Sequence, residues 1–595
     1  MAARQGGDGR ELLAWVPVVV GLVLWAQGLG GVDASALPAW GLVPRLPWSF
    51  WAGLAVLLGG ALVLVSLRRV RHLALTAHLG GLVVLLYSTA PILESVPRYP
   101  YTYKHIAITD YIELYGSVDK SIDIYHRWPG FFSLSAWFSQ VAGLPNPVSY
   151  AAWSELYFAL LDALLVWAAA QALTRSSRLA WSAALLFSVS NWVGQGYYSP
   201  QALGYVLMLG VLLACLAGLN AQSGPIGRFL ERLVARVLRV RAVEQDPTTR
   251  LPRPDVRRLV LLVVLLDLVL AASHQLTPYV LLLQLGSLVV GGWIRPWWVA
   301  VVATVATIAY LIPNLDFIIN TFGLLSSADP LANATSKTVE GTPAFAQRII
   351  SLIAVAALLT AFGLAAVGLL RRARAGHVRD ALVLFALAFT PPVTLIAQSY
   401  GGEARLRVLL YALPWCSVAA CWAWSPRDER RFWAPALVTV GLAVGFVVLF
   451  FGREDLNQLT PDEVRAAAYL FDANKPGAVV MLTTPNFPAR FGPLYFRLAR
   501  ADLPALSYDK FGERPLLFPS QLDVDVAASL IEEKGGNRGN GGWLVFSQGQ
   551  EAWARDYQLF PPSSLRAFEG AVASSPRFRI VFDTPTARVY ELVPA

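Results

Sequence analysis

The sequence predicts a polytopic, all-α membrane bundle of about 13 transmembrane helices, followed by a C-terminal α/β domain outside the membrane. The chain of 595 residues is 56% hydrophobic and only 15% charged, whereas a soluble domain has about 25% charged residues. Uncharged apolar runs of about 18–20 residues, long enough to span a membrane as helices, recur from residue 12 to residue 451. From about residue 453 the composition becomes that of a soluble domain.

Thirteen apolar segments are expected to cross the membrane. In chain order they are 12–29, 50–67, 73–93, 149–173, 179–193, 202–219, 259–272, 278–293, 297–313, 349–370, 381–397, 408–424 and 433–451. We divide the chain into two extra N-terminal helices (1–72), a membrane core (73–452) and a terminal domain (453–595). The core contains a large outer loop at 94–148 and a basic loop at 220–258.

Arginine placement predicts the orientation of these spans. Every second connection is rich in arginine, and the connection at 220–258 alone holds nine arginines. The alternate short loops at 194–201 and 273–277 contain neither lysine nor arginine. Because positive residues stay in the cytoplasm, we expect a cytoplasmic N-terminus in the plasma membrane and an extracytoplasmic C-terminal domain. The same alternation argues that the net charge of +9 reflects membrane topology and not nucleic-acid binding.

Residues 228–243 are predicted to form a basic amphipathic helix within the cytoplasmic loop. Arginines 228, 232, 236 and 239 share one helical face, and leucines and valines lie largely opposite. Such a helix lies in the membrane interface against anionic headgroups. An anchoring role is favoured over a regulatory one.

The terminal domain is predicted to alternate helices and strands. Helices are expected at 461–474, 521–534 and 563–574, and strands at 478–484, 543–546, 578–583 and 587–593. This region has no glycine-rich phosphate loop, nucleophile elbow or metal-binding spacing. The sequence indicates no function for this domain beyond covering the central polar segment.

The polar segment at 99–130 contains the candidate catalytic acids. Asp110 lies in the apolar context IAITDYI, where partial burial would raise its pKa toward that of a general base. An equally favoured alternative is that Asp110 caps a short helix. Asp123 is the second candidate base, whereas Glu113 and Asp119 are interpreted as solvated helix residues.

Several basic side chains are candidates for holding a phosphate. Lys104, His126 and Arg127 belong to the polar segment, although anchoring at the membrane interface is the simpler interpretation of His126 and Arg127. His274 lies at the outer end of a span, where a lone histidine is more often structural. Arg405 and Arg407 lie on the outer side against the charge rule, which makes them the strongest phosphate candidates.

A second outer loop, at 191–201, is polar, aromatic and uncharged. Its Tyr197, Tyr198 and Gln201, together with Glu403 from the arginine-containing loop, are candidate contacts for a sugar or an acceptor. Aromatic rings beside amides suit a sugar, and they also suit an aromatic belt at the membrane surface.

The pattern resembles the GT-C class of integral-membrane glycosyltransferases, which includes protein O-mannosyltransferases and bacterial aminoarabinose transferases of lipid A. The resemblance lies in an acid in the first large outer loop, here D-Y-I-E-L-Y-G at 110–116, and in a later Pro-containing turn, Y-H-R-W-P-G at 125–130. Many relatives also end in an extracytoplasmic α/β domain. The paired acids of some families are absent here, since Thr109 and Tyr111 flank Asp110.

The resemblance implies inverting transfer of a hexose or pentose from a polyprenyl-phosphate carrier to a glycan, lipid or protein acceptor in the cell envelope. Asp110 would deprotonate the acceptor hydroxyl, and the basic residues named above would hold the leaving phosphate. No cofactor is certain, and the residues leave open whether a divalent cation such as Mg²⁺ or Mn²⁺ takes part.

Two other classes of protein compete with the enzyme. A transporter or lipid flippase needs ionisable residues within its helices, and here Asp162 and Asp267 are the plausible ones. No inverted repeat accompanies them. A non-catalytic scaffold that binds cell-wall components through its C-terminal domain is the third class, and it would keep its binding when the catalytic acid is removed.

Overall fold

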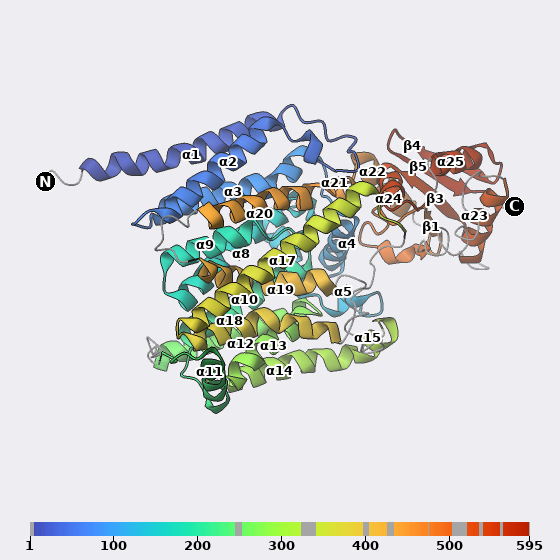
Figure 1. Cartoon of the computed structure of the whole chain (residues 1–595). Coiled ribbons are helices and arrows are strands. Elements are labelled where there is room, and N and C mark those ends of the chain that lie inside the picture. The colour runs from blue at the N-terminus through green and yellow to red at the C-terminus, as the bar shows by residue number, and fades with distance from the viewer. Residues whose placement is uncertain are drawn as a thin grey trace.

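The computed structural model describes residues 5–243, 253–322, 341–396, 404–424, 433–473, 475–501, 521–534, 540–559 and 563–593. Within these ranges, nine helices are long and apolar enough to cross a membrane, and two shorter apolar helices accompany them. The helices lie roughly side by side in one bundle, and a small sheet domain is attached at one end (Figure 1). The chain is therefore a multi-pass membrane protein.

All thirteen predicted spans are helical. They are α1 (Gln5–Leu29), α2 (Trp48–Ser66), α3 (His72–Leu93), α8 (Ser154–Thr174), α9 (Ser177–Ser188), α10 (Pro200–Gly218), α12 (Arg253–Ser273), α13 (Thr277–Val290), α14 (Trp298–Leu311), α17 (Phe345–Arg374), α18 (Val378–Phe389), α19 (Ala404–Ala420) and α20 (Trp433–Phe451). Two of them fall short as spans, because α9 has only 12 residues and α12 carries Arg257, Arg258 and Asp267. Across the described ranges, nine to eleven of the thirteen crossings are thus supported.

The central polar segment folds into four short helices between α3 and α8. These are α4 (Pro100–Tyr115), α5 (Ile124–Arg127), α6 (Gly130–Ala142) and α7 (Val148–Ala151). Pro100 starts α4, where a missing backbone N–H costs nothing, and Gly116 ends it in the left-handed conformation (φ 62°). Asp123 caps α5 by accepting the backbone N–H groups of Tyr125 and His126.

One predicted alternative is corrected by these helix boundaries. Asp110 is not a helix cap, because α4 begins ten residues earlier, at Pro100, and Asp110 lies in its C-terminal half. The capping acid of this region is Asp123. The interpretation of Asp119 as a helix residue is also wrong, since Asp119 lies between α4 and α5 and accepts the Ser121 backbone N–H instead.

The C-terminal domain is built on one mixed sheet. Its strands are β1 (Val479–Leu482), β2 (Ala499–Ala501), β3 (Gly542–Ser547), β4 (Phe578–Asp583) and β5 (Ala587–Leu592), in the order β2-β1-β3-β5-β4. β1 pairs in parallel with β2 and β3, whereas β5 runs antiparallel to β3 and β4. The helices that pack on the sheet are α22 (Pro461–Asp472), α23 (Gln521–Lys534), α24 (Gln548–Asp556) and α25 (Ser564–Ser574). Every predicted strand and helix of this domain is confirmed, and β2 and α24 are additional.

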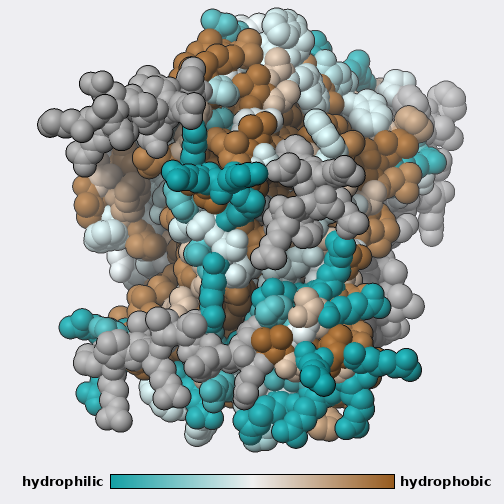
Figure 2. Space-filling model, turned by 60° about the vertical axis from the view of Figure 1, so that its left-hand side comes forward, coloured by the Kyte–Doolittle hydropathy of each residue, from teal (hydrophilic) through white to brown (hydrophobic). Residues whose placement is uncertain are grey.

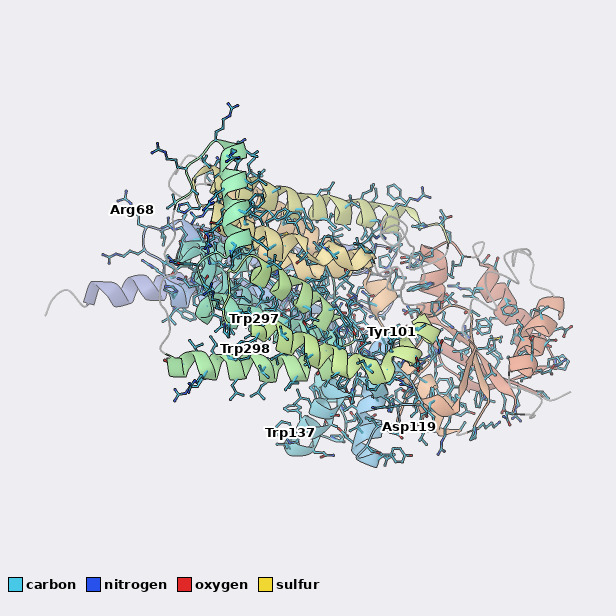
Figure 3. The ribbon with its side chains drawn as sticks, turned by 90° about the horizontal axis from the view of Figure 1, so that it is seen from below. Arg68, Tyr101, Asp119, Trp137, Trp297 and Trp298 are labelled. Carbon is cyan, nitrogen blue, oxygen red and sulfur yellow. The ribbon has the colours of Figure 1, made fainter. Side chains whose placement is uncertain are left out.

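The two ends of the bundle differ. The N-terminal end of α1 lies at the end opposite the C-terminal domain (Figure 1). Figure 3 places Arg68 at that same far end, whereas Asp119 lies beside the C-terminal domain. We call the end that carries the C-terminal domain the domain end, and the other the far end. The predicted basic helix is present as α11 (Pro225–Leu238), which lies at the far end (Figure 1) and ends five residues before the predicted boundary, with Arg239 as its left-handed C-cap.

Candidate functional site

Helix α4 is polar in sequence and yet buried at the domain end. Thr102, Lys104, His105 and Thr109 are each at most 5% exposed. The C-terminal domain covers this helix, since the Tyr103 ring stacks on Phe491 with centroids 5.9 Å apart. The expectation that the soluble domain covers the central polar segment is therefore confirmed.

A buried arginine gathers three carboxylates where α3 ends and α4 begins. The Arg98 guanidinium contacts Glu155 Oε2 at 2.6 Å and also pairs with Glu454. The rings of Tyr99 and Phe450 flank the guanidinium carbon at 4.9 and 4.6 Å. We call Glu94, Arg98, Glu155 and Glu454 the arginine–carboxylate cluster.

Glu94 is the partly exposed member of this cluster, whereas Arg98, Glu155 and Glu454 are buried. Burial and the nearby charge of Glu454 raise the pKa of Glu94 well above its usual range, against the opposing effect of Arg98. One arginine cannot neutralise three carboxylates. The neutral form of Glu94 is therefore favoured more strongly than it would be in water.

Tyr99 connects this cluster to the second outer loop. Its backbone has φ 68°, a conformation that costs free energy in a residue with a side chain. The Tyr99 N–H donates to the Asn457 carbonyl at 2.8 Å, and its hydroxyl lies 3.3 Å from Glu155 Oε1. The Tyr99 ring packs on Tyr197 with centroids 5.1 Å apart. These contacts hold the strained residue in place.

The aromatic loop at 191–199 lies against His105 of α4. The His105 ring stacks on Tyr197 at 5.7 Å with an interplanar angle of 14°, and His105 Nδ1–H donates to the Tyr198 carbonyl at 2.7 Å. Burial lowers the pKa of His105 to about 3, so that the ring is neutral. Gln201 is buried close by in the chain, and neither end of its amide has a hydrogen-bond partner within the described ranges.

Arg407 and His274 meet at the same end of the bundle. Arg407 is 9% exposed and donates to Gln195 Oε1 at 2.7 Å, which ties α19 to the aromatic loop. His274 Nδ1 accepts the Thr277 backbone N–H at 3.1 Å. Burial, followed by the positive charge of Arg407, lowers the pKa of His274 well below its usual range. The structure thus brings four of the predicted residues to one region. They are Tyr197 and Tyr198, which contact His105, together with Arg407 and His274.

Lys104 and Asp123 form a separate ion pair under the C-terminal domain. Lys104 Nζ lies 2.8 Å from Asp123 Oδ2, which also accepts the hydroxyl of Tyr495 from the C-terminal domain at 2.7 Å. Burial alone would raise the pKa of Asp123, but the charge of Lys104 and these hydrogen bonds lower it to about 2. So acidic a carboxylate is a weak base, and its contacts hold the C-terminal domain on α4 and α5.

Asp110 has a different environment from Asp123. It is partly exposed, and one of its carboxylate oxygens is buried with no hydrogen-bond partner among the residues that the structure describes. Burial, with a smaller contribution from the charge of Glu113, raises the pKa of Asp110 to about 7. This value matches what a general base requires near neutral pH.

The remaining predicted residues are dispersed. His126 is buried and its Nδ1 accepts the Asp119 backbone N–H at 3.2 Å. Arg127 contacts Asn314 Oδ1 at 3.3 Å and lies over the Phe317 ring at 4.3 Å. Arg405 is exposed at the start of α19. Glu403 lies outside the described residues.

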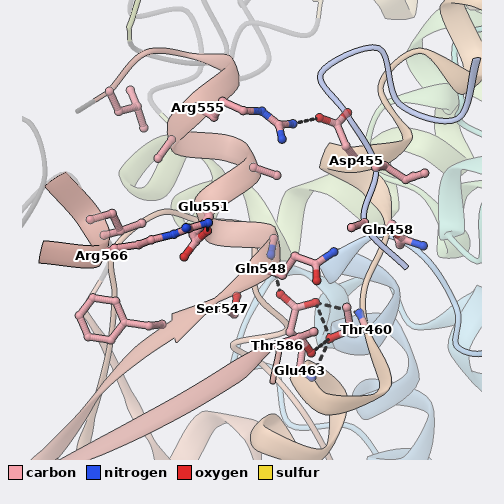
Figure 4. Close-up of a pocket in the computed structure, with 18 of the residues that line it drawn as sticks. Asp455, Gln458, Thr460, Glu463, Ser547, Gln548, Glu551, Arg555, Arg566 and Thr586 are labelled. Carbon is pink, nitrogen blue, oxygen red and sulfur yellow. Dashed lines mark hydrogen bonds and ion pairs between the residues drawn. The ribbon is translucent and has the colours of Figure 1, made fainter. Parts of the chain in front are cut away.

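A large cavity opens between the C-terminal domain and the loop that joins α1 to α2. Its volume is about 1300 Å³, and residues from α1–α2, α22, α24 and α25 line it (Figure 4). The short helix α21 (Glu454–Asn457) connects it to the arginine–carboxylate cluster. Glu454 pairs with Arg98 in the bundle, and the next residue, Asp455, lines the cavity and pairs with Arg555.

The sequence interpretation did not identify the arginine–carboxylate cluster. Arg98, Glu155 and Glu454 come from segments up to 356 residues apart, and none was selected as a site residue. The sequence did contain one local signal, because two charged residues, Glu94 and Arg98, lie four positions apart directly after an apolar span. A charged pair at such a boundary is costly to bury, which makes it a functional candidate.

No group of three histidine, cysteine, aspartate or glutamate side chains is arranged to hold a metal ion in the described part of the chain. Two glutamates of the cluster, Glu155 and Glu454, pair with Arg98.

The fold and site can be set beside known proteins. No protein-family model and no curated protein matches the sequence. Among solved structures, the chain is similar over most of its length to a bacterial ArnT and to an archaeal oligosaccharyltransferase.

The first of these is ArnT from Cupriavidus metallidurans bound to undecaprenyl phosphate, with 13% identity, a TM-score of 0.47, and 87% of this chain and 97% of that chain covered. The second is the oligosaccharyltransferase AglB from Archaeoglobus fulgidus in complex with an inhibitory peptide and a dolichol-phosphate, with 11% identity, a TM-score of 0.49, and 83% and 72% covered. At these scores the likeness extends to no residue and no activity of this chain.

Proposed function

We propose that the protein transfers a sugar from a polyprenyl-phosphate carrier to an acceptor at the domain end of the bundle, with inversion at the sugar carbon. The observation that carries this proposal is a polar site of acids and cations at one end of an apolar helical bundle, covered by a soluble domain. A lipid-linked sugar has its phosphate at the membrane surface and its tail among the helices. A transferase for it therefore needs charged groups at the ends of membrane helices.

Asp110 is proposed as the general base. Its pKa of about 7 allows it to take the proton of the acceptor hydroxyl and to remain charged for part of the time beforehand. The acceptor oxygen would then form a bond to the sugar carbon as the bond to the carrier phosphate breaks. Asp123, with a pKa of about 2, is assigned to holding Lys104 and Tyr495.

Arg407 is proposed as the main phosphate ligand, because it is a buried cation at the domain end that donates to the Gln195 side chain of the aromatic loop. It would stabilise the charge that grows on the leaving phosphate. Arg405, Lys104, His126, Arg127 and His274 remain the other proposed phosphate ligands. Of these, His274 lies close enough to Arg407 for the arginine charge to lower the pKa of His274.

The aromatic loop and the large cavity suit the two substrates. Tyr197 and Tyr198, with Gln201, are proposed to contact the sugar, since stacked rings beside an unsatisfied amide suit a polyhydroxylated ring. Glu403 stays a proposed contact from the sequence. The acceptor, whether glycan, lipid or protein, is proposed to enter the cavity of about 1300 Å³ beside α21.

The orientation follows from the arginine distribution. We propose thirteen crossings, with α9 and α12 included, a cytoplasmic N-terminus and an extracytoplasmic C-terminal domain in the plasma membrane. The opposite positions of the N-terminus and the C-terminal domain in the bundle support this odd number of crossings (Figure 1).

The test uses membranes that contain the overexpressed protein and a panel of labelled polyprenyl-phosphate sugars. Wild type is expected to consume one donor, and Asp110→Asn is expected to lose about 10²–10⁴-fold of that activity. The matched control is Asp119→Asn, an exposed acid of the same segment that should keep full activity. Glu94→Gln is the rival variant. If it abolishes transfer while Asp110→Asn does not, then the base belongs to the arginine–carboxylate cluster.

Transport is the second candidate function, and two acids within the helices favour it. Asp162 and Asp267 are buried, and at least one carboxylate oxygen of each has no hydrogen-bond partner in the part of the chain described. Asp162 also lines a cavity of about 20 Å³ with Glu155 and Tyr87. Intact lipid-linked sugar that crosses a vesicle membrane without being cleaved, and that stops doing so in Asp162→Asn, would replace the transferase proposal.

A further inference from the structure

A second polar cavity lies at the far end of the bundle, away from the candidate site. Its volume is about 200 Å³, and it is formed where α8 ends, where α10 leads into α11, and where α17 turns into α18. Its lining includes Arg175, Arg372, Arg379, Asp380 and Trp293. None of these residues takes part in the proposed glycosyl transfer.

The charges of this cavity do not balance. Arg372 pairs with Asp380 at 2.6 Å. Arg379 donates to two neutral oxygens, Asn220 Oδ1 at 2.5 Å and the Ala221 carbonyl at 2.8 Å. Even with Glu231 of the adjoining α11 included, three arginines face two carboxylates. An excess of positive charge in a partly buried hollow is a site for an anion.

Two local features support a ligand in this cavity. Trp293 is 4% exposed and lines the cavity, and its indole N–H has no hydrogen-bond partner among the described residues. A buried donor without a partner is costly, and an anion oxygen would provide the missing acceptor. Arg175 ends α8 in the left-handed conformation (φ 54°), a position that favours glycine. The strained arginine brings a further cation to the rim.

The adjoining helix α11 places the cavity at the level of lipid headgroups. Phe229, Leu233 and Val237 of α11 are 44–71% exposed and follow one another at helical spacing. Arg228, Arg232 and Arg236 are exposed on the next face of the helix. A helix with these two exposed faces lies in the membrane interface. Figure 2 turns this end toward the viewer and shows hydrophilic side chains gathered over its lower half.

We propose that the far-end cavity binds a phosphate group, that of an anionic phospholipid headgroup. Arg379 and Arg175 would contact the phosphate oxygens, the Trp293 N–H would donate to one of them, and the acyl chains would lie beside the apolar face of α11. A free cytoplasmic phosphate offers the same chemistry from another source, and the experiment separates the two.

The experiment uses the full-length protein in nanodiscs that contain either phosphatidylglycerol or only phosphatidylcholine. Native mass spectrometry is expected to show retained phosphatidylglycerol, and its affinity should fall about tenfold in Arg379→Gln and about threefold in Trp293→Phe. The control is Arg69→Gln, which removes one exposed positive charge from the same end. It should change retention little.

Arg175→Gly protects the test from misfolding, because glycine suits the left-handed position. This variant should lose phosphate affinity and keep its thermal stability. Stabilisation by inorganic phosphate in detergent, lost in Arg379→Gln, together with no retained phosphatidylglycerol, would assign the site to the free anion. Equal losses in Arg69→Gln and Arg379→Gln, or no effect of any variant, would overturn the proposal.

Discussion

The two ends of this bundle treat positive charge in opposite ways. At the domain end, Arg98 is 6% exposed and is surrounded by three glutamates, and Lys104 is paired with Asp123. At the far end, the arginines of α11 are exposed, and Arg379 is satisfied by neutral oxygens. A cation removed from solvent is costly unless carboxylates or other hydrogen-bond acceptors compensate its charge, whereas one at the headgroup level can bind anionic lipid headgroups. Substitutions at the two ends should therefore have very different costs.

The largest effect is expected when Arg98 is replaced. Arg98→Met leaves Glu155 and Glu454 buried without their cation, which should cost about 3–5 kcal/mol. Thermal unfolding of the detergent-solubilised protein should show a sharply lower midpoint or a loss of folded protein. The matched variant Arg69→Met at the far end should shift the midpoint little, and equal shifts in the two variants would contradict the comparison.

The docking of the C-terminal domain should depend on pH through Asp123. The fall of its pKa from 3.8 to about 2 corresponds to about 2 kcal/mol. Since the folded pKa is the lower one, this stabilisation is complete above pH about 4 and is lost as the pH falls toward 2. Limited proteolysis should release the C-terminal domain more readily over that range. Asp123→Asn should remove this pH dependence, and an unchanged pH profile in the variant would assign the docking to other contacts.

Asp110 should show the opposite pH dependence. Its pKa is raised from 3.8 to about 7, so its ionisation destabilises the folded state as the pH rises from about 4 to 7. Asp110→Asn should therefore raise the free energy of unfolding more at pH 8 than at pH 5. The difference should be on the order of 2 kcal/mol, a value reduced because the side chain is partly exposed. Thermal unfolding at the two pH values measures this difference. A gain that is equal at both pH values would mean that Asp110 is ionised in the folded protein at pH 5.

The smallest effect is expected at the far end. Arg175→Gly removes a side chain from the left-handed position at the end of α8 and should stabilise the fold by about 0.5 kcal/mol. The midpoint of thermal unfolding should stay the same or rise slightly. A fall of several degrees would show that the arginine is needed to hold α8 to its neighbours.

Local patterns predicted most of the fold. Apolar runs identified all thirteen helical segments, and alternating strands and helices identified the C-terminal sheet except for β2, whose three residues, Ala-Arg-Ala, carry no apolar signal. In the described residues, length and composition support nine to eleven of the thirteen spans, because a run such as 179–193 is apolar but folds into a helix of 12 residues. An apolar segment is expected to be buried. A single sequence does not distinguish burial inside the protein from burial in the lipid bilayer.

The candidate site was less predictable. Tyr197, Tyr198, His274 and Arg407 were selected from local chemistry, and the structure brings them to one region. The pairing of Arg98 with Glu155 and Glu454 depends on contacts between distant helices, which no local spacing encodes. Asp110 and Asp123 look alike in sequence, and only their neighbours separate a pKa of about 7 from one of about 2.

The arginine–carboxylate cluster also constrains the order in which the protein is made. Glu155 follows Arg98 by 57 residues, whereas Glu454 follows it by 356. At about 5–20 residues per second, Arg98 leaves the ribosome roughly 20–70 s before Glu454. During that interval Glu94 and Glu155 are the glutamates of the cluster that the growing chain can already supply. Because Tyr495, which contacts Asp123, is translated later still, the C-terminal domain can cover the site only late in biosynthesis.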